Sequence, residues 1–268
     1  MITSTSNGQI KKIQQLLKKS RTRKDEGIFV AEGIKMFREA PPDRIEKIYL
    51  GASFAEKEIW KEILREKGLE GEKESLVEIV EDKVFKSLSD TVTPQGVLCL
   101  IRIKEGTLEE MIPKDRPALL MILEDLQDPG NLGTIIRTGE GAGVTGIILS
   151  KNSVDIYNPK VIRSTMGSVY RVPFCYTSSI REEILPWLRE KKITGYAAHL
   201  EGKNSYDRED YTKGTAFFIG NEGNGLRECV AECADCRIKI PMAGKAESLN
   251  AAVAASILMY EVSRQRRD

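Results

Sequence analysis

The sequence predicts an α/β protein of two domains, the second built around a mostly parallel sheet flanked by helices. Strand-like apolar segments alternate with amphipathic helical segments along the 268 residues, which is the pattern of α/β domains. Residues 118–126, ALLMILEDL, are nearly continuously apolar, as is typical of a parallel strand covered on both faces. The polar stretch 104–117 contains two prolines and is predicted to be a linker. The predicted domains are therefore residues 1–103 and 118–268.

The first half is predicted to be a compact α/β/α domain. Residues 9–19 have the spacing of an amphipathic helix, with Ile10, Ile13, Leu16 and Leu17 on one face. The predicted strands of this half are 27–31, 47–50, 75–80 and 96–103. Its other predicted helices lie near 32–40, 54–67 and 81–89.

The second half contains more strands, with helices between most of them. The final helix, 248–265, is predicted to carry an apolar stripe that faces either the core of the chain or a partner subunit. The stripe consists of Leu249, Ala252, Val253, Ser256, Ile257 and Tyr260. The predicted strands are 118–126, 146–150, 172–176, 193–200, 215–220 and 237–241.

Composition excludes several classes of protein. Lysine and arginine total 41 and aspartate and glutamate total 40, so the net charge indicates no class of partner. No apolar run has the roughly 20 residues of a membrane span, and the N-terminus lacks the apolar core of a secretory signal. Five cysteines do not indicate a disulfide framework, which favours a reducing cytoplasm. The single histidine, His199, is predicted to be structural or on the surface.

The first 24 residues are basic and contain no acidic residue. Such a run is either a solvated helix face or a surface that contacts nucleic acid phosphates. The basic residues are Lys11, Lys12, Lys18, Lys19, Arg21, Arg23 and Lys24.

Three motifs each follow an apolar strand, where open α/β sheets bind ligands. In the first, 128–138, a Pro-Gly turn precedes Asn131, which can cap the next helix, and Arg137 follows. The same residues are compatible with a plain strand-to-helix turn that carries a surface arginine.

The second motif, 218–226, places three glycines and Glu222 after a strand. Glycines let backbone approach a ligand closely, although a flexible connector has the same composition. The third motif, 240–250, ends in a helix whose first turn carries Ser248 and Asn250. A helix N-terminus suits a carboxylate or phosphate, and ordinary capping by Ser248 is the alternative.

Taken together, the three motifs resemble the SpoU (TrmH-type) family of S-adenosyl-methionine-dependent RNA ribose 2′-O-methyltransferases, in the SPOUT superfamily. The match covers residues 118–264 and includes family-like residues between 157 and 174. The first half resembles the ribosomal-protein-like substrate-binding domain of many members. The resemblance implies a deep trefoil knot, a homodimer formed through the C-terminal domain, S-adenosyl-methionine as cofactor and no metal. It implies an RNA substrate, ribosomal RNA rather than transfer RNA.

The resemblance also implies roles for individual residues. Backbone groups of Gly220, Ile240 and Leu249 would hold the adenosine, and the loop around Met242 would close over it. In the family, the residue matching Arg137 is proposed to help deprotonate the hydroxyl. Because arginine stays protonated, we expect Arg137 instead to bind the target phosphate and stabilise charge at the attacking oxygen. The residues that would organise the site are Asn131, Glu222, Ser248 and Asn250, and the basic N-terminal residues would bind RNA.

Other interpretations remain open. Cys229, Cys233 and Cys236 have the spacing of an iron–sulfur cluster in radical S-adenosyl-methionine enzymes, but one helical face of small buried residues would have the same spacing. A GxGxxG match at 141–146 ends a predicted helix, so we interpret it as a helix C-terminal turn. The alternative functions are action on transfer RNA and a non-catalytic RNA-binding role in assembly.

Two further expectations concern single residues. Cys99 and Cys175 are predicted core residues. Gly139 and Gly141 replace alanines that are usual in the family, and they are expected to weaken their helix.

Overall fold

The structure, a computed structural model, describes residues 1–69, 71, 75–89, 91 and 93–267. The chain forms two compact units. Unit 1 comprises residues 1–104 together with 157–170, and unit 2 comprises 105–156 together with 171–268. The segment 157–170 therefore belongs to unit 1, although the strands before and after it belong to unit 2.

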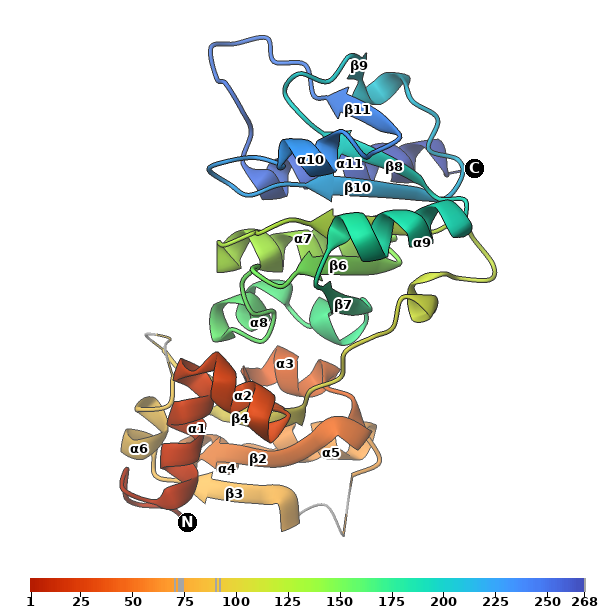
Figure 1. Cartoon of the computed structure of the whole chain (residues 1–268). Helices are drawn as coiled ribbons and strands as arrows, with labels where there is room; N and C mark the ends of the chain where they lie inside the picture. The colour runs from red at the N-terminus through yellow and green to blue at the C-terminus, as the bar shows by residue number, and fades with distance from the viewer. Residues whose placement is uncertain (70, 72–74, 90, 92, 268) are drawn as a thin grey trace. The chain divides into compact units, whose positions relative to one another are not determined.

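Unit 1 is a four-stranded sheet with helices packed on it (Figure 1). The strand order is β1-β4-β2-β3, in which β4 is antiparallel to both neighbours and β2 and β3 are parallel. The strands are β1 Ile28–Glu32, β2 Ile45–Gly51, β3 Val77–Val80 and β4 Val97–Arg102. The helices are α1 Gly8–Lys18, α2 Ser20–Glu26, α3 Ile34–Glu39, α4 Ala52–Ala55, α5 Ile59–Glu66, α6 Asp82–Lys86 and α8 Pro159–Thr165, with short 3₁₀ turns at Pro42–Arg44 and Ser168–Tyr170.

The two faces of the unit 1 sheet are covered by different parts of the chain. Helix α1 buries Ile10, Ile13 and Leu16 completely, in a core shared with one sheet face, which confirms the predicted apolar face of that helix. On the other face, the ring of Phe29 lies 4.5 Å from that of Tyr157, centroid to centroid. The segment 157–170 thus closes the core of unit 1.

One predicted helix of unit 1 is interrupted, and one helix is present that was not predicted. The predicted helix 54–67 is two helices, α4 and α5, and the indole of Trp60 donates a hydrogen bond to the carbonyl of Ala55 at the end of α4. Helix α1 ends at Lys18, and α2 follows after the extended residue Lys19.

The break after α1 explains why Arg23 is buried. Its side chain is 3% exposed, and Nη1 donates to the carbonyl of Leu16 at 2.6 Å. Carbonyls at the end of a helix have no intrahelical donor, and Arg23 satisfies one of them. The prediction that Arg23 contacts RNA is therefore wrong for the folded unit.

Replacing Arg23 with glutamine is expected to destabilise the protein by about 1–3 kcal/mol, because a buried carbonyl loses its charged donor. Urea unfolding followed by circular dichroism measures the change. Arg21→Gln is the control, since the Arg21 side chain is 91% exposed. Equal midpoints for the two variants would show that Arg23 is not structural.

Unit 2 is a seven-stranded sheet in which every pairing is parallel, with the order β7-β6-β5-β10-β8-β11-β9. This confirms the predicted parallel sheet. The strands are β5 Leu119–Leu123, β6 Gly146–Ser150, β7 Phe174–Thr177, β8 Thr194–Ala198, β9 Asn204–Ser205, β10 Thr215–Ile219 and β11 Cys236–Lys239. The helices are α7 Pro129–Ala142, α9 Leu185–Glu190, α10 Glu228–Ala231 and α11 Ala251–Gln265, with 3₁₀ turns at Glu109–Met111 and Tyr206–Arg208 and a π-helical turn at Ile180–Ile184.

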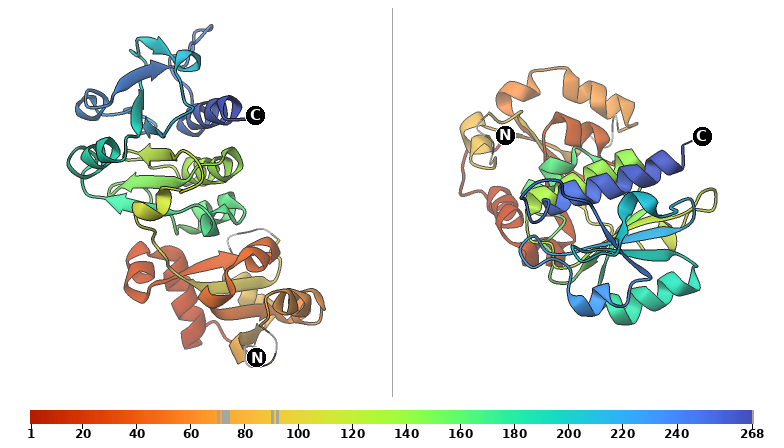
Figure 2. Two further views of the ribbon diagram at one scale, coloured as in Figure 1. Left: turned by 90° about the vertical axis from the view of Figure 1, so that its right-hand side faces the viewer. Right: turned by 90° about the horizontal axis from the view of Figure 1, so that it is seen from above.

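Helices cover both faces of this sheet (Figure 2). Helices α9 and α10 share one core with the sheet, while α7 and α11 pack against each other on the opposite face. All five residues of β5 are buried, as its apolar sequence predicts. The predicted linker also contributes to a core, because Met111 is fully buried and contacts Gly146 closely. Residues 105–117 are therefore part of unit 2.

Of the two alternatives for the apolar stripe of α11, the core of the chain holds for Ala252 alone, the only buried member of the stripe. The helix begins at Ala251 and buries Ala252, Ala255, Leu258, Met259 and Val262. Val253 and Tyr260 of the predicted stripe are 48% and 49% exposed. Alanines on both sides of the helix weaken the apolar periodicity, so the sequence did not distinguish the two faces.

The helical glycines of α7 lie under α11. A Cβ on Gly139 would lie 3.4 Å from the sulfur of Met259, and one on Gly141 would lie 3.4 Å from the hydroxyl of Tyr260. These glycines therefore permit close packing of the two helices, although glycine lowers the intrinsic stability of a helix.

Across the described ranges, no helix is long and apolar enough to span a bilayer.

Candidate functional site

The three motifs meet at one edge of the unit 2 sheet. All seven strands are parallel, so their carboxyl ends lie at the same edge. The chain runs from β5 outward to β6 and β7 on one side, and β10 lies on the other side of β5. This reversal of strand order is where open α/β sheets bind ligands. The motifs follow β5, β10 and β11.

The first motif begins α7 with a different cap from the one predicted. Asp128 is the N-cap, and its Oδ1 accepts a hydrogen bond from the backbone N–H of Asn131 at 2.7 Å. Pro129 occupies the first turn, as is favourable there. Because Asp128 caps the helix, the side chain of Asn131 is available for other contacts.

The side chain of Asn131 joins the three motifs. Its Nδ2 donates to Glu222 Oε1 at 3.0 Å, and its Oδ1 accepts from Asn250 Nδ2 at 2.9 Å. Asn250 in turn caps α11, where its Oδ1 accepts from the N–H groups of Ala252 and Val253. These contacts bring together three of the predicted site residues, Asn131, Glu222 and Asn250.

Glu222 is held as a carboxylate. It also accepts from the backbone N–H groups of Gln127 at 3.0 Å and Asp128 at 2.9 Å. Partial burial alone would raise the pKa of Glu222, but the hydrogen bonds from Gln127, Asn131 and Asp128 outweigh it and lower the pKa. The group therefore carries a negative charge at neutral pH and has no proton to donate.

The lowered pKa of Glu222 predicts a pH dependence of stability. The pKa of Glu222 in the folded protein lies below its ordinary value of 4.5. The contribution of the Glu222 carboxylate to the free energy of unfolding is therefore fully present above about pH 4.5. It is lost as the pH falls through the folded-state pKa. We expect the difference in unfolding free energy between the wild type and Glu222→Gln to narrow below about pH 4.5. Urea unfolding between pH 7 and pH 3 tests this, and a pH-independent difference would contradict it.

The glycine-rich second motif is an ordered turn. A Cβ on Gly220 would lie 2.0 Å from the backbone nitrogen of Leu226, so only glycine fits there. Asn221 and Gly225 bond to each other through their backbones, and Asn221 Nδ2 donates to the carbonyl of Asp125 at 2.8 Å. The alternative of a flexible connector is therefore wrong, and the turn fixes Glu222 relative to the end of β5.

An ion pair between a buried carboxylate and an exposed arginine, which the sequence analysis missed, holds the same turn. Glu124 is 1% exposed and accepts from Arg227 through its backbone N–H at 2.8 Å and through Nε at 2.6 Å. The neighbouring Asp125 has a φ of 52°, and its backbone N–H is held by Ser150 Oγ at 2.8 Å. A glutamate at the end of an apolar strand was the available sequence signal, because a buried acid requires a partner.

Two predicted catalytic residues are not joined to this cluster. Arg137 is exposed on α7, and within the described ranges it has no hydrogen bond or ion pair. Ser248 is exposed and does not cap α11, because that cap is Asn250. The alternative of ordinary capping by Ser248 is therefore wrong.

The third motif is an exposed loop. Residues 241–248 are exposed, Ile240 and Leu249 are half-buried, and Met242 is 37% exposed. In this loop, whose residues are all described, no backbone group bonds to another part of the chain. Its amides and carbonyls can hold an adenosine, its apolar side chains can contact a purine, and the charge of Glu222 complements a sulfonium. These residues fit S-adenosyl-methionine.

The competing motifs have structural explanations. Gly143, with a φ of 84°, ends α7, which confirms a helix C-terminal turn there. Cys229 lies on α10 and Cys236 on β11, so the three cysteines do not share a helical face as the alternative assumed. Among the described residues, no group of His, Cys, Asp or Glu side chains is arranged to hold a metal ion. His199 accepts from the N–H of Glu201. Cys99 is buried as predicted, and Cys175 is partly buried.

The basic N-terminal residues of unit 1 differ in their availability. Lys12 pairs with Glu26 at 2.6 Å, and Arg21 lies 3.6 Å from Asp25. Four lysines are exposed to solvent: Lys11, Lys18, Lys19 and Lys24.

Comparison with known proteins identifies relatives of both units. Residues 118–260 match the model of the SpoU rRNA methylase family, and residues 7–99 match the MRM3-like substrate binding domain. The 23S rRNA (guanosine(2553)-2′-O)-methyltransferase RlmP of Bacillus subtilis is 33% identical over 69% of this chain and 71% of its own.

Solved structures are similar over nearly the whole chain. The AdoMet-bound rRNA methyltransferase from Sinorhizobium meliloti has a TM-score of 0.87 and 30% identity, covering 100% of this chain and 98% of its own. The SpoU methyltransferase AviRb from Streptomyces viridochromogenes, in complex with AdoMet, has a TM-score of 0.85 and 26% identity. The match covers 97% of this chain and 98% of the AviRb chain.

Proposed function

The chain belongs to the SpoU rRNA methylase family, and we propose that it transfers a methyl group from S-adenosyl-methionine to a ribose 2′-hydroxyl of ribosomal RNA. The observation that carries this proposal is the hydrogen-bonded chain Asn250–Asn131–Glu222 at the reversal of strand order. The relatives named above are methyltransferases, and two have AdoMet bound.

The chain's own groups have distinct proposed roles in holding S-adenosyl-methionine. When bound, this cofactor supplies a methyl group on a positively charged sulfur. Backbone groups of Gly220, Ile240 and Leu249 hold its adenosine, and the exposed loop around Met242 covers it. The buried turn at Gly220 and the exposed backbone of residues 241–248 support these assignments.

The reaction is a displacement in which the ribose 2′-oxygen forms a bond to the methyl carbon as the carbon–sulfur bond breaks, and the hydroxyl proton is released. We propose that Asn131 and Asn250 orient the reacting groups, since correct positioning lowers the barrier of such a displacement. Glu222 fixes Asn131 by accepting a hydrogen bond from its side-chain amide. Ser248 lies in the loop beside the site and contacts the substrate. Arg137 binds the target phosphate and stabilises negative charge on the attacking oxygen, because its guanidinium stays protonated.

Unit 1 is proposed to bind the RNA. It contains the match to a substrate binding domain, and its exposed lysines offer charge to phosphates. Lys11, Lys18 and Lys19 are therefore the favoured contacts. Lys24 and Arg21 are also exposed but have partners within the fold, and Lys12 would first have to leave Glu26.

Three further features belong to this proposal. A homodimer through the C-terminal domain would cover the exposed side chains of Val253 and Tyr260 on α11, whose 48% and 49% exposure is unusual for apolar residues of a packed helix. A trefoil knot formed by the segment after β11 is implied by the family.

A cytoplasmic location is supported by five free thiols, which suit a reducing compartment.

The test is methyl transfer from labelled S-adenosyl-methionine to unmodified ribosomal and transfer RNA transcripts, followed by alkaline hydrolysis. A 2′-O-methyl group protects the adjacent phosphodiester, so we expect label in alkali-resistant dinucleotides from ribosomal RNA. Label in mononucleotides would indicate base methylation, and label in transfer RNA alone would overturn the choice of substrate.

A further inference from the structure

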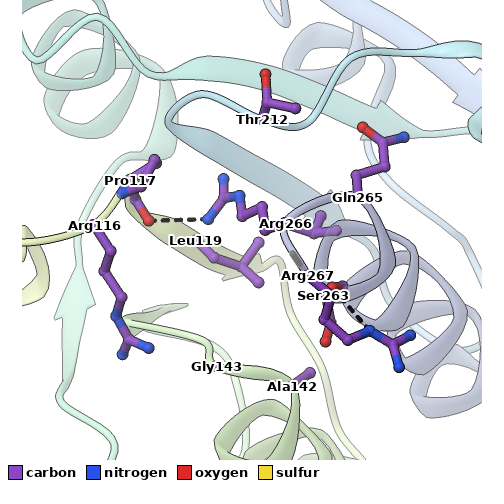
Figure 3. Close-up of a pocket in the computed structure, with 11 residues that line it drawn as sticks. Arg116, Pro117, Leu119, Ala142, Gly143, Thr212, Ser263, Gln265, Arg266 and Arg267 are labelled. Atoms are coloured by element: carbon purple, nitrogen blue, oxygen red, sulfur yellow. Dashed lines mark hydrogen bonds between the residues drawn. The ribbon is translucent and has the colours of Figure 1, made fainter.

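A pocket lies at the edge of the unit 2 sheet opposite to the three motifs. Its volume is about 430 Å³, within the range typical of small-molecule sites. It lies between the start of β5 at Leu119, the end of α7 at Gly143 and the end of α11 (Figure 3). It is separate from the three motifs, which follow the carboxyl ends of the strands.

The lining of this pocket is strongly basic. Arg116, Arg266 and Arg267 all line it, and none of its lining residues is acidic. Helices α7 and α11 both end there, and each helix C-terminus contributes about half a negative charge. Three full positive charges exceed two half charges, so the pocket is left electropositive.

The three arginines are not equivalent. Arg266 is structural, because Nη1 donates to the carbonyl of Pro117 at 2.9 Å and Nε donates to that of Tyr211 at 2.8 Å. Burial, and secondly the charge of Arg116, lower the pKa of Arg266. An anion beside these two cations would relieve their repulsion.

Arg116 and Arg267 can contact a ligand. In Figure 3 their side chains flank the corner formed by Ala142 and Gly143, and Arg116 Nη1 lies 3.6 Å from the Cβ position of Gly143. Within the described ranges Arg116 has no hydrogen bond or ion pair. Arg267 uses one donor, Nε, on the carbonyl of Ser263 at 3.3 Å. Most N–H groups of both guanidiniums therefore remain for an anion.

We propose that this pocket binds the phosphate of a nucleotide. Guanidinium groups bind phosphate oxygens through paired hydrogen bonds, which accounts for Arg116 and Arg267. The exposed side chain of Pro117 supplies an apolar surface for the ring, and Gln265 adds hydrogen-bonding groups. The nucleotide is either free in solution or part of an RNA strand.

Calorimetric titration of the whole protein with uridine 5′-monophosphate, and with uridine as the ligand without phosphate, tests the site. We expect uridine to bind at least tenfold more weakly, and Arg116→Gln/Arg267→Gln to lower affinity for the monophosphate roughly 100-fold. The control is Arg181→Gln/Arg189→Gln, which removes the same charge from exposed residues outside the pocket. Arg116→Gln alone removes no hydrogen bond and serves if the double variant fails to fold.

Equal affinities in the two double variants, or no binding of the monophosphate to the wild type, would overturn the proposal. Methyl-transfer kinetics then identify the source of the nucleotide. A raised KM for RNA with unchanged kcat in Arg116→Gln/Arg267→Gln assigns the site to RNA. An unchanged KM, with loss of monophosphate binding, assigns it to a free nucleotide. The binding measurement does not depend on methyl transfer, so either proposal can fail without the other.

Discussion

Replacing Asn131 with alanine is expected to lower kcat for methyl transfer about 100-fold, because displacement of reacting groups by about 1 Å has an effect of this size. The substitution removes a donor from Glu222 and an acceptor from Asn250 at once. Both partners then lose the contact that links the motifs after β5, β10 and β11. The structural cost is expected to be about 1–3 kcal/mol, small enough for the protein to remain folded.

Single-turnover methyl transfer with saturating S-adenosyl-methionine measures this effect separately from binding. Asn224→Ala is the matched control, since it removes an exposed asparagine side chain from the neighbouring turn while the backbone N–H of Asn224 still bonds to Asn221. We expect that control to stay within about twofold of the wild type, as for surface substitutions. A wild-type rate for Asn131→Ala would remove this residue from the reaction.

Replacing Arg137 with alanine is expected to reduce kcat by about 100- to 1,000-fold, the loss seen when one charge-stabilising donor is removed from an active site. The thermal midpoint should not change, because Arg137 is exposed and has no bonding partner in the described part of the chain. A large kinetic effect without a structural effect is the signature of a residue that acts on substrate.

Arg189→Ala is the control for the loss of a positive charge, because Arg189 is exposed on α9 and outside the three motifs. Both variants are compared by thermal unfolding and by methyl transfer. If Arg137→Ala loses stability and activity in parallel, or retains full activity, the role proposed for Arg137 is incorrect.

The parallel sheet was predictable because its strands are encoded locally. The buried strand β5 is apolar throughout, and β6 occupies residues 146–150 as predicted. The face of α11 was not predictable, because it depends on close packing against Gly139 and Gly141 of a helix more than 100 positions earlier. The division between the units was likewise hidden, since the aromatic contact of Tyr157 with Phe29 is a tertiary contact.

Three of the five predicted catalytic residues lie together, but the hydrogen bonds that join them were not predictable. The motifs identified Asn131, Glu222 and Asn250, which the structure brings into contact. The sequence assigned helix capping to Asn131 because asparagine is a good cap, but Asp128, three residues earlier, takes that role. The position of Glu124 at the end of an apolar strand indicates that it needs a partner, but Arg227 lies 103 positions away and no local pattern identifies it.

The central claim is that the three motifs act as one catalytic unit, and a double-mutant cycle on Asn131 and Asn250 tests it most directly. Asn250→Ser keeps a good helix cap but is too short to donate to Asn131. Single-turnover rates are measured for Asn131→Ala, Asn250→Ser and the double variant. We predict a double variant about as slow as the slower single variant, because each change breaks the same unit. Multiplying effects would show that the two residues act independently and would contradict the claim.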